Sequence, residues 1–219
     1  MQKEMQQHEE LIERLTLHYT GGSYKDEVAR AKHEFFDEAG IVDEESAQFE
    51  MRMTQFLEWY LFTRPLEGRE TAPAKHALQG GEFGYEPAEQ EALESLANTR
   101  HSLFEFLKIR GEDVHIKDLF TGKKIVIEKS PVRVGFSREQ IFDTRLVRSG
   151  DTFVFTKAFC LHPEEATKFI LAEVKKLKKA EPILQEALML RLLKMRYKYE
   201  QYKHLKLEHV YTNERKMKF

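Results

Sequence analysis

Cations and phenol rings alternate near the end of this 219-residue sequence, in a pattern that suits phosphate groups and unpaired bases. Arg191, Lys194 and Lys198 recur at i, i+3 and i+7, which places them on one face if the segment is helical. An ordinary solvated helix face explains the same cations, and we favour that interpretation. The candidate nucleic-acid-binding residues are Lys175, Lys176, Lys178, Lys179, Arg191, Lys194, Tyr197, Lys198, Tyr202 and Lys203.

A thiol and an imidazole stand two positions apart at Cys160 and His162. Alternate residues of a strand share a face, so the pair has two parts of an activated cysteine nucleophile. The neighbouring sequence offers no third group to orient the imidazole, and a cysteine that ends an apolar strand is typically buried. We therefore expect no catalytic residue here. Cys160 is the single cysteine, which excludes an internal disulfide and a cysteine-rich zinc site.

Other polar residues do not combine into a metal or nucleotide motif. His33 and Asp37 are four residues apart in an acidic stretch, and a solvated helix face is the favoured interpretation. The Thr121-Gly122-Lys123 segment has the end of a phosphate-binding loop without its first glycine, so we expect a hairpin turn there. We expect no metal and no cofactor.

Two pairs of phenylalanines have the i, i+2 spacing that puts both rings on one face of a strand. The pairs are Phe104 with Phe106 and Phe153 with Phe155. Facing outward, they would be platforms on which bases stack. Facing inward, they would fill a small sheet's core, which is the commoner arrangement and the one we expect.

The elements that must position these residues begin with helices. Leu11, Ile12, Leu15 and Tyr19 have the spacing of an apolar helical stripe. The stretch 65–85 is rich in glycine and is expected to be a long loop, placed to act as a lid over a site. The helices expected in this region cover residues 4–19, 23–39, 43–65, 73–79 and 86–98.

A period of two replaces the helical period between residues 102 and 160. Val114 and Ile116 alternate with polar residues, as in a half-buried strand. Five short runs with tight turns predict an antiparallel sheet that curls into an SH3-like or OB-like barrel, which removes exposed edges. The expected strands cover residues 102–109, 113–119, 123–129, 140–147 and 152–160.

Helical periodicity returns after Pro163, which suits a first helical turn. We expect one helix to about Lys179 and another from Pro182 to about His204, followed by an extended tail over 205–219. The second helix has an apolar stripe that includes Leu184, Leu188, Leu192, Met195, Tyr199 and Tyr202. The predicted fold class is therefore α+β, with a helical region (1–100), a small barrel or sheet (101–161) and a C-terminal helical pair (162–219) that packs back on the first region.

Composition and charge limit the function classes. Hydrophobic residues make up 41% and charged residues 33%, which is typical of a folded chain, and no apolar run reaches the ~18 residues of a membrane span. The acidic, polar start of the sequence is unlike a secretory signal, so we expect the protein to be located in the cytoplasm. Residues 1–100 hold 10 Lys/Arg against 21 Asp/Glu, whereas residues 163–219 hold 14 against 8. The basic end is expected to dock on the acidic end, within one chain or across a dimer, or on an anionic partner such as RNA, DNA or a membrane surface.

Four segments stand in a familiar order: Phe56-Leu57-Glu58-Trp59-Tyr60-Leu61-Phe62 with Arg64-Pro65-Leu66, Ser102-Leu103-Phe104-Glu105, Asp118-Leu119-Phe120-Thr121-Gly122 and Phe159-Cys160-Leu161-His162-Pro163. With these segments the chain resembles a group of uncharacterised bacterial proteins, some of which continue into a short SEC-C zinc-binding tail. The resemblance covers roughly residues 49–165, and the single cysteine cannot build such a tail. It implies a bacterial cytoplasmic origin and no activity, so no functional residue is carried over.

These observations predict a non-catalytic interaction or adaptor protein that binds a protein partner or itself. The alternative is a nucleic-acid-binding protein that uses the basic, aromatic C-terminal helix. The third hypothesis is an enzyme or small-ligand receptor with a site between helices and barrel.

Overall fold

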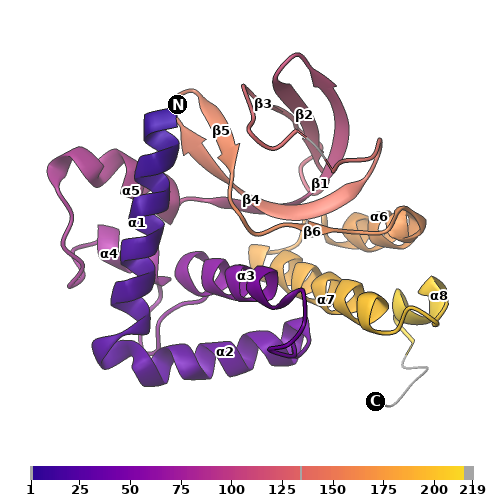
Figure 1. The fold of residues 1–219 in the computed structure, drawn as a ribbon, viewed down its shortest axis with the longest axis horizontal. Coiled ribbons are helices and arrows are strands. Elements are labelled where there is room, and N and C mark those ends of the chain that lie inside the picture. Colours follow the sequence, from indigo (N-terminus) through magenta and orange to yellow (C-terminus); the bar gives the residue numbers. More distant parts are fainter. Residues whose placement is uncertain (1, 134, 215–219) are drawn as a thin grey trace. The chain divides into compact units, whose positions relative to one another are not determined.

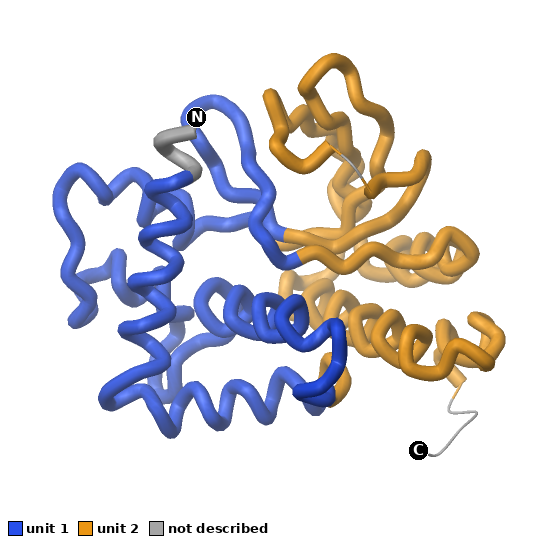
Figure 2. Tube along the Cα trace, viewed as in Figure 1, with its two compact units in different colours: residues 1–37, 42–100, 145–158 blue, residues 38–41, 101–144, 159–219 orange. Residues whose placement is uncertain are grey.

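The computed structural model describes residues 2–133 and 135–214, with side chains from residue 6 onward. Among the described residues, helices precede and follow the strands of a sheet (Figure 1). The residues group into two compact units (Figure 2). Unit 1 comprises residues 1–37, 42–100 and 145–158, and unit 2 comprises residues 38–41, 101–144 and 159–219. The stretch 101–161 therefore contributes to both units.

Unit 1 is mainly helical. Most of the predicted stripe of the first helix is confirmed, because Leu11, Leu15 and Tyr19 are fully buried, while Ile12 is half-buried. The hydroxyl of Tyr60 donates a hydrogen bond of 2.8 Å to the carbonyl oxygen of Tyr19, which joins the first and third helices. The helices are α1 (Gln2–Thr20), α2 (Lys25–Ala39), α3 (Phe49–Phe62), α4 (Pro73–Leu78) and α5 (Gln90–Ala97), with 3-10 turns at Gly22–Tyr24 and Pro87–Glu89 before α2 and α5.

The third helix begins at Phe49, so the prediction that it begins at Asp43 was wrong. The Asp43 carboxylate accepts the N–H of Glu45 at 3.0 Å, and its carbonyl oxygen accepts the N–H of Ser46 at 3.0 Å. Asp43 therefore stabilises a separate turn instead of capping the helix, which is the usual competition between a short polar side chain and the helical backbone.

The predicted antiparallel sheet is confirmed, and it curls into a half-barrel (Figure 1). Its order is β3-β2-β1-β4-β5, and β6 pairs with β4. Val114 and Ile116 of β2 are fully buried while Asp113, His115 and Lys117 beside them are half-buried, as the alternation predicted. The strands are β1 (Arg100–Arg110), β2 (Asp113–Asp118), β3 (Lys124–Ile127), β4 (Ile141–Ser149), β5 (Thr152–Phe155) and β6 (Cys160–Leu161).

The segment 152–160 is not one strand, as predicted, but two. After β5 the hydroxyl of Thr156 donates to Glu58 at 2.7 Å, and the N–H of Ala158 donates to the same carboxylate at 3.1 Å. A backbone N–H that bonds a side chain is lost to the strand ladder, so the pairing stops before β6.

The phenylalanine pairs behave differently from each other. Phe104 and Phe106 are buried in unit 2, as expected, and Phe106 stacks on Phe136 with ring centroids 5.1 Å apart. Phe153 and Phe155 in unit 1 are only half-buried, so the core expectation was too strong for them.

Unit 2 packs its helices around an apolar core. The helices are α6 (Thr167–Leu177), preceded by a 3-10 turn at Glu164–Ala166, α7 (Pro182–Gln201) and α8 (Leu207–Val210). The expectation of an extended tail from residue 205 was wrong for its described part, because Val210 and Tyr211 are buried in this core. The core consists of Leu103, Leu119, Phe120, Ile141, Ala166, Ile170, Val174, Leu188, Met189, Leu192, Met195, Val210 and Tyr211.

The predicted stripe of α7 begins one turn too early. Leu188 and Leu192 are buried, but Leu184 is 50% exposed and its neighbour Ile183 is 75% exposed. Among the described helices, none has both the length and the apolar character needed to cross a bilayer.

Candidate functional site

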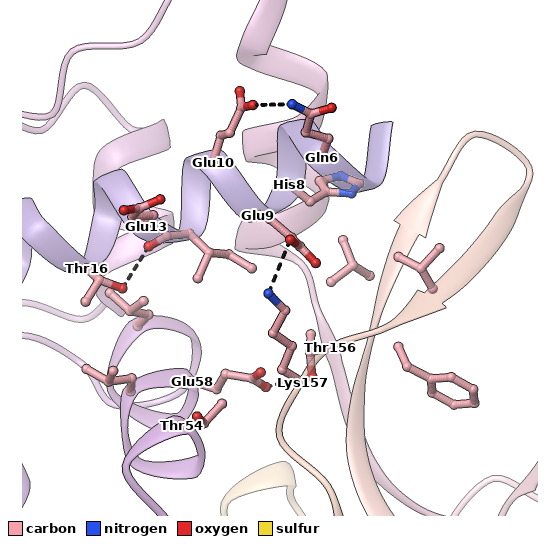
Figure 3. Close-up of a pocket in the computed structure, with 16 residues that line it drawn as sticks. Gln6, His8, Glu9, Glu10, Glu13, Thr16, Thr54, Glu58, Thr156 and Lys157 are labelled. Carbon is pink, nitrogen blue, oxygen red and sulfur yellow. Dashed lines mark hydrogen bonds and ion pairs between the residues drawn. The ribbon is translucent and has the colours of Figure 1, made fainter. Parts of the chain in front are cut away.

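Unit 1 contains a pocket of about 360 Å³ (Figure 3). The pocket is lined by α1, by α3, by strands β4 and β5, and by the residues that follow β5. The helix α3 contributes Thr54, Leu57 and Leu61, whose spacing of i, i+3 and i+7 places them along one helix face. None of the residues in the predicted lid, 65–85, is part of this lining.

The pocket floor is apolar. Val147 of β4 and Val154 of β5 are paired across the two strands, so their side chains stand side by side on one face of the sheet. Aliphatic side chains from the helices meet them there. The apolar lining residues are Ile12, Leu57, Leu61, Val147, Val154 and Phe155.

The rim of the pocket is acidic. Glu9, Glu10 and Glu13 line it from α1, and the rim cation is Lys157, whose Nζ lies 3.2 Å from a carboxylate oxygen of Glu9. Figure 3 shows this pair facing each other, while Glu10 bonds Gln6 on the helix surface at 2.9 Å. A ligand with a positive group beside an apolar group would therefore meet complementary charge at this rim.

Glu58 also lines the pocket, but it is a buried structural anchor. Its carboxylate accepts the bonds from Thr156 and Ala158, and the Nε of Arg145 lies 4.0 Å from it. Arg145 is buried as well, and its guanidinium lies 5.9 Å from the Phe62 ring centroid. These three neighbours fix the carboxylate in place and so link α3 to the end of β5.

The hydroxyl groups of the described lining are all engaged in hydrogen bonds. The lining contains no cysteine and no serine, and each of its three threonine hydroxyls donates a hydrogen bond to another protein group. Thr16 bonds the Ile12 carbonyl at 2.7 Å, Thr54 bonds the Glu50 carbonyl at 2.9 Å, and Thr156 bonds Glu58. A hydroxyl nucleophile needs an adjacent base that removes its proton, and a backbone carbonyl is not one.

In unit 2, tertiary structure supplies the third group that the sequence around Cys160 and His162 lacks. The Cys160 Sγ lies 3.9 Å from Nε2 of His162, and Nδ1 of His162 lies 3.1 Å from the hydroxyl of Tyr211. Burial lowers the pKa of His162 to about 4, so the ring is neutral near pH 7, and burial raises the pKa of Tyr211. All three side chains are buried. The trio is therefore a hydrogen-bonded part of the core, closed to a substrate, as expected for Cys160.

The structure divides the ten predicted nucleic-acid-binding residues into two sets. Lys175, Lys176, Lys178 and Lys179 are exposed at the end of α6 and in the turn after it, and Lys203 is exposed just after α7. The other five, Arg191, Lys194, Tyr197, Lys198 and Tyr202, are half-buried or buried in unit 2.

The second set is engaged in packing and pairing. Arg191 donates to Glu173 at 2.5 Å and to Asn213 at 3.0 Å. The Tyr197 side chain is buried, so its ring face is not open to a base. Lys176 of the first set also pairs with Glu173.

Metal ligation finds no support among the described residues, where no group of three or more His, Cys, Asp or Glu side chains is placed to hold an ion. His33 and Asp37 form an exposed pair at 3.1 Å, the solvated helix face that their spacing predicted.

The pocket itself was not predicted as a set of residues. The third hypothesis gave its general position, between helices and strands, but the sequence does not show which side chains meet there. A usable signal was Glu58, the lone carboxylate inside the apolar run 56–62, because a charge in such a position needs partners from another element.

Comparison with known proteins gives one match. Residues 3–190 match the model of a family described as "Family of unknown function (DUF7986)", which confirms the expectation of an uncharacterised family. No curated protein matches the chain, and no solved structure matches it.

Proposed function

The chain belongs to DUF7986, a family of unknown function, and we propose that it is a non-catalytic interaction protein whose unit 1 pocket binds a protein partner. The observation that carries the proposal is the combination of an apolar floor with an acidic rim in one pocket of about 360 Å³. The bacterial cytoplasm is the proposed compartment, and kinship with chains that carry a SEC-C tail is part of the proposal; both rest on the resemblance over residues 49–165.

The pocket defines the chemistry of the partner. Burying one or two aliphatic or aromatic side chains on the floor supplies affinity through the hydrophobic effect. The three glutamates that α1 places at the rim outnumber its one lysine, so a lysine or arginine beside those apolar groups is attracted and an acidic neighbour is repelled. We infer a partner segment that presents an apolar side chain flanked by basic residues.

The test is selection of short random peptides displayed on phage, followed by measured affinities of the enriched peptides for the purified protein. We expect enriched sequences with an apolar residue next to lysine or arginine. In the variant Glu9→Lys/Glu13→Lys, attraction at the rim becomes repulsion, and we expect about ten-fold weaker binding, equivalent to ~1.4 kcal/mol. Filling the floor with Ile12→Trp is expected to abolish binding.

A matched control makes the same charge change outside the pocket. Glu44 and Glu70 are exposed in unit 1 and do not line the pocket, so Glu44→Lys/Glu70→Lys should bind as the unchanged protein does. Enrichment of acidic peptides, or equal loss of affinity in the control and the rim variant, would refute the proposal. Binding of small apolar amines but of no peptide would favour the third hypothesis, a small-ligand receptor.

Nucleic-acid binding stays the alternative function, supported by the exposed lysines at the end of α6. It predicts binding to RNA or DNA that falls steeply as salt rises, because each neutralised phosphate releases counterions. Fluorescence anisotropy with labelled RNA and DNA at low and at physiological salt tests it directly.

A further inference from the structure

Three large aliphatic side chains are exposed on the outer side of α6 and in the first turn of α7. Leu171 is 43% exposed, Ile183 is 75% exposed and Leu184 is 50% exposed. Isolated exposed aliphatic residues are common, but Ile183 and Leu184 are adjacent and stand in the first turn of a helix whose later leucines are buried. The periodicity of α7 predicted that both residues belong to its buried stripe, so their exposure was not expected.

The turn that carries Ile183 and Leu184 is well ordered by hydrogen bonds. The side-chain amide of Gln185 donates to the carbonyl of Leu177 at 3.0 Å, which links the start of α7 to the end of α6. The N–H of Leu184 donates to the carbonyl of Glu181 at 2.9 Å. The two aliphatic side chains are thus held on an ordered backbone, so binding through them costs little further backbone conformational entropy.

Lysines flank Leu171 along α6, and another lysine precedes Ile183 in the turn. Lys168, Lys175 and Lys178 are at i−3, i+4 and i+7 from Leu171, which puts the four residues on one face of α6 and its continuation. Lys179 follows in the turn. Lys176 is not counted, because it pairs with Glu173, and Glu181 is the one exposed carboxylate between Lys179 and Ile183. We name as the basic–apolar patch Lys168, Leu171, Lys175, Lys178, Lys179, Ile183 and Leu184.

We propose that the basic–apolar patch docks the protein on an anionic lipid bilayer surface. Lysine ammonium groups are attracted to anionic headgroups, and each one near such a surface raises binding about five-fold. Aliphatic side chains beside them enter the boundary between headgroups and acyl chains, as on interfacial amphipathic helices.

The same residues are less suited to nucleic acid. Isoleucine and leucine side chains gain nothing from phosphate groups, and single-stranded recognition depends on aromatic rings that stack on bases. Of the tyrosines expected for that purpose, Tyr197 is buried in unit 2. The aliphatic half of the patch is therefore explained by lipid and left unexplained by RNA or DNA.

The experiment is flotation of the full-length protein with vesicles of phosphatidylcholine alone and of phosphatidylcholine mixed with phosphatidylglycerol. We expect binding to the mixed vesicles only, weakening as salt rises. The variant Lys175→Glu/Lys178→Glu should lose binding to the mixed vesicles both at low and at physiological salt. Ile183→Ser/Leu184→Ser keeps every charge, yet its affinity for the mixed vesicles should fall at least about ten-fold, because the inserted aliphatic area is gone.

Strand β3 offers a matched control in the same unit. Lys123 and Lys124 are exposed near Val126, which is 39% exposed. The variants Lys123→Glu/Lys124→Glu and Val126→Ser therefore make the same kinds of substitution outside the basic–apolar patch. These controls should bind vesicles as the unchanged protein does.

Two results would overturn the proposal. One is absence of binding to anionic vesicles at low salt. The other is binding to labelled RNA or DNA that Lys175→Glu/Lys178→Glu abolishes and Ile183→Ser/Leu184→Ser leaves unchanged, which would assign the lysines to nucleic acid. The peptide-binding test of the unit 1 pocket uses other residues, so the two proposals succeed or fail separately.

Discussion

Glu173 ties together three parts of unit 2, and its removal tests how that unit is held. Its carboxylate on α6 accepts hydrogen bonds from Arg191 of α7 at 2.5 Å and from Asn213 after α8 at 3.0 Å, and it also pairs with Lys176. The side chain is only 8% exposed. Burial by itself raises the pKa of this carboxyl, but these partners outweigh it and lower the pKa to about 2.

The pKa gives both the size and the sign of the pH effect. The ordinary value is 4.5, so the shift corresponds to about 3 kcal/mol of stability at neutral pH, with one pKa unit worth ~1.4 kcal/mol. Because the folded-state pKa is the lower one, this stability is complete above pH 4.5 and is lost as the pH falls toward 2. Between pH 7 and pH 3 the loss should be about 2 kcal/mol.

The perturbation is Glu173→Gln, which keeps the size of the side chain and removes its charge. We expect the free energy of unfolding to fall by about 3 kcal/mol at pH 7, measured by urea denaturation followed by circular dichroism. Other carboxylates titrate in both proteins, so the informative quantity is the difference between them. That difference should shrink by about 2 kcal/mol at pH 3. A difference that stays constant with pH would show that the ion pairs do not supply the stability.

Two further predictions concern buried charge. His162 has a folded-state pKa of about 4 against an ordinary 6.5, so the protein should lose stability as the pH falls from 6.5 toward 4. Between pH 7 and pH 5, the free energy of unfolding of His162→Gln, measured by urea denaturation, should fall by about 2 kcal/mol less than that of the unchanged protein. Equal losses in the two proteins would contradict this prediction. Glu58→Leu removes the carboxylate beside the buried Arg145 and should lower the free energy of unfolding by about 3–5 kcal/mol. Adding Arg145→Met to this variant should restore part of the loss, as measured by thermal unfolding. A double variant no more stable than Glu58→Leu would count against the pairing.

Local patterns predicted the elements of this fold. The stripe of Leu11, Leu15 and Tyr19 and the alternation of Val114 and Ile116 each follow from a repeat that matches the geometry of one helix or one strand. Such repeats are properties of neighbouring residues, so the sequence alone was sufficient for the α+β class, for α4 and for the antiparallel sheet. It also placed Phe104 and Phe106 correctly in the core.

The errors arose where a residue bonds a partner that is distant in the sequence or competes with the helical backbone. Asp43 made its own turn, and Glu58, about a hundred residues before Ala158, took the backbone N–H that would have continued β5. Tyr211 completes the hydrogen bonds of His162 from the other end of unit 2. Periodicity carries no information about such contacts.

The amino-acid sequence by itself determined the positions of most helices and strands and how charge is distributed along the chain, because both depend on residue type and spacing. Tertiary structure alone decided that Glu9, Leu57 and Val154 line one pocket, that Tyr197 is buried, and that Ile183 is exposed. The reason is physical: side-chain exposure and the meeting of distant residues are set by packing between elements, and similar stripes can face a core or solvent until their neighbours are in place.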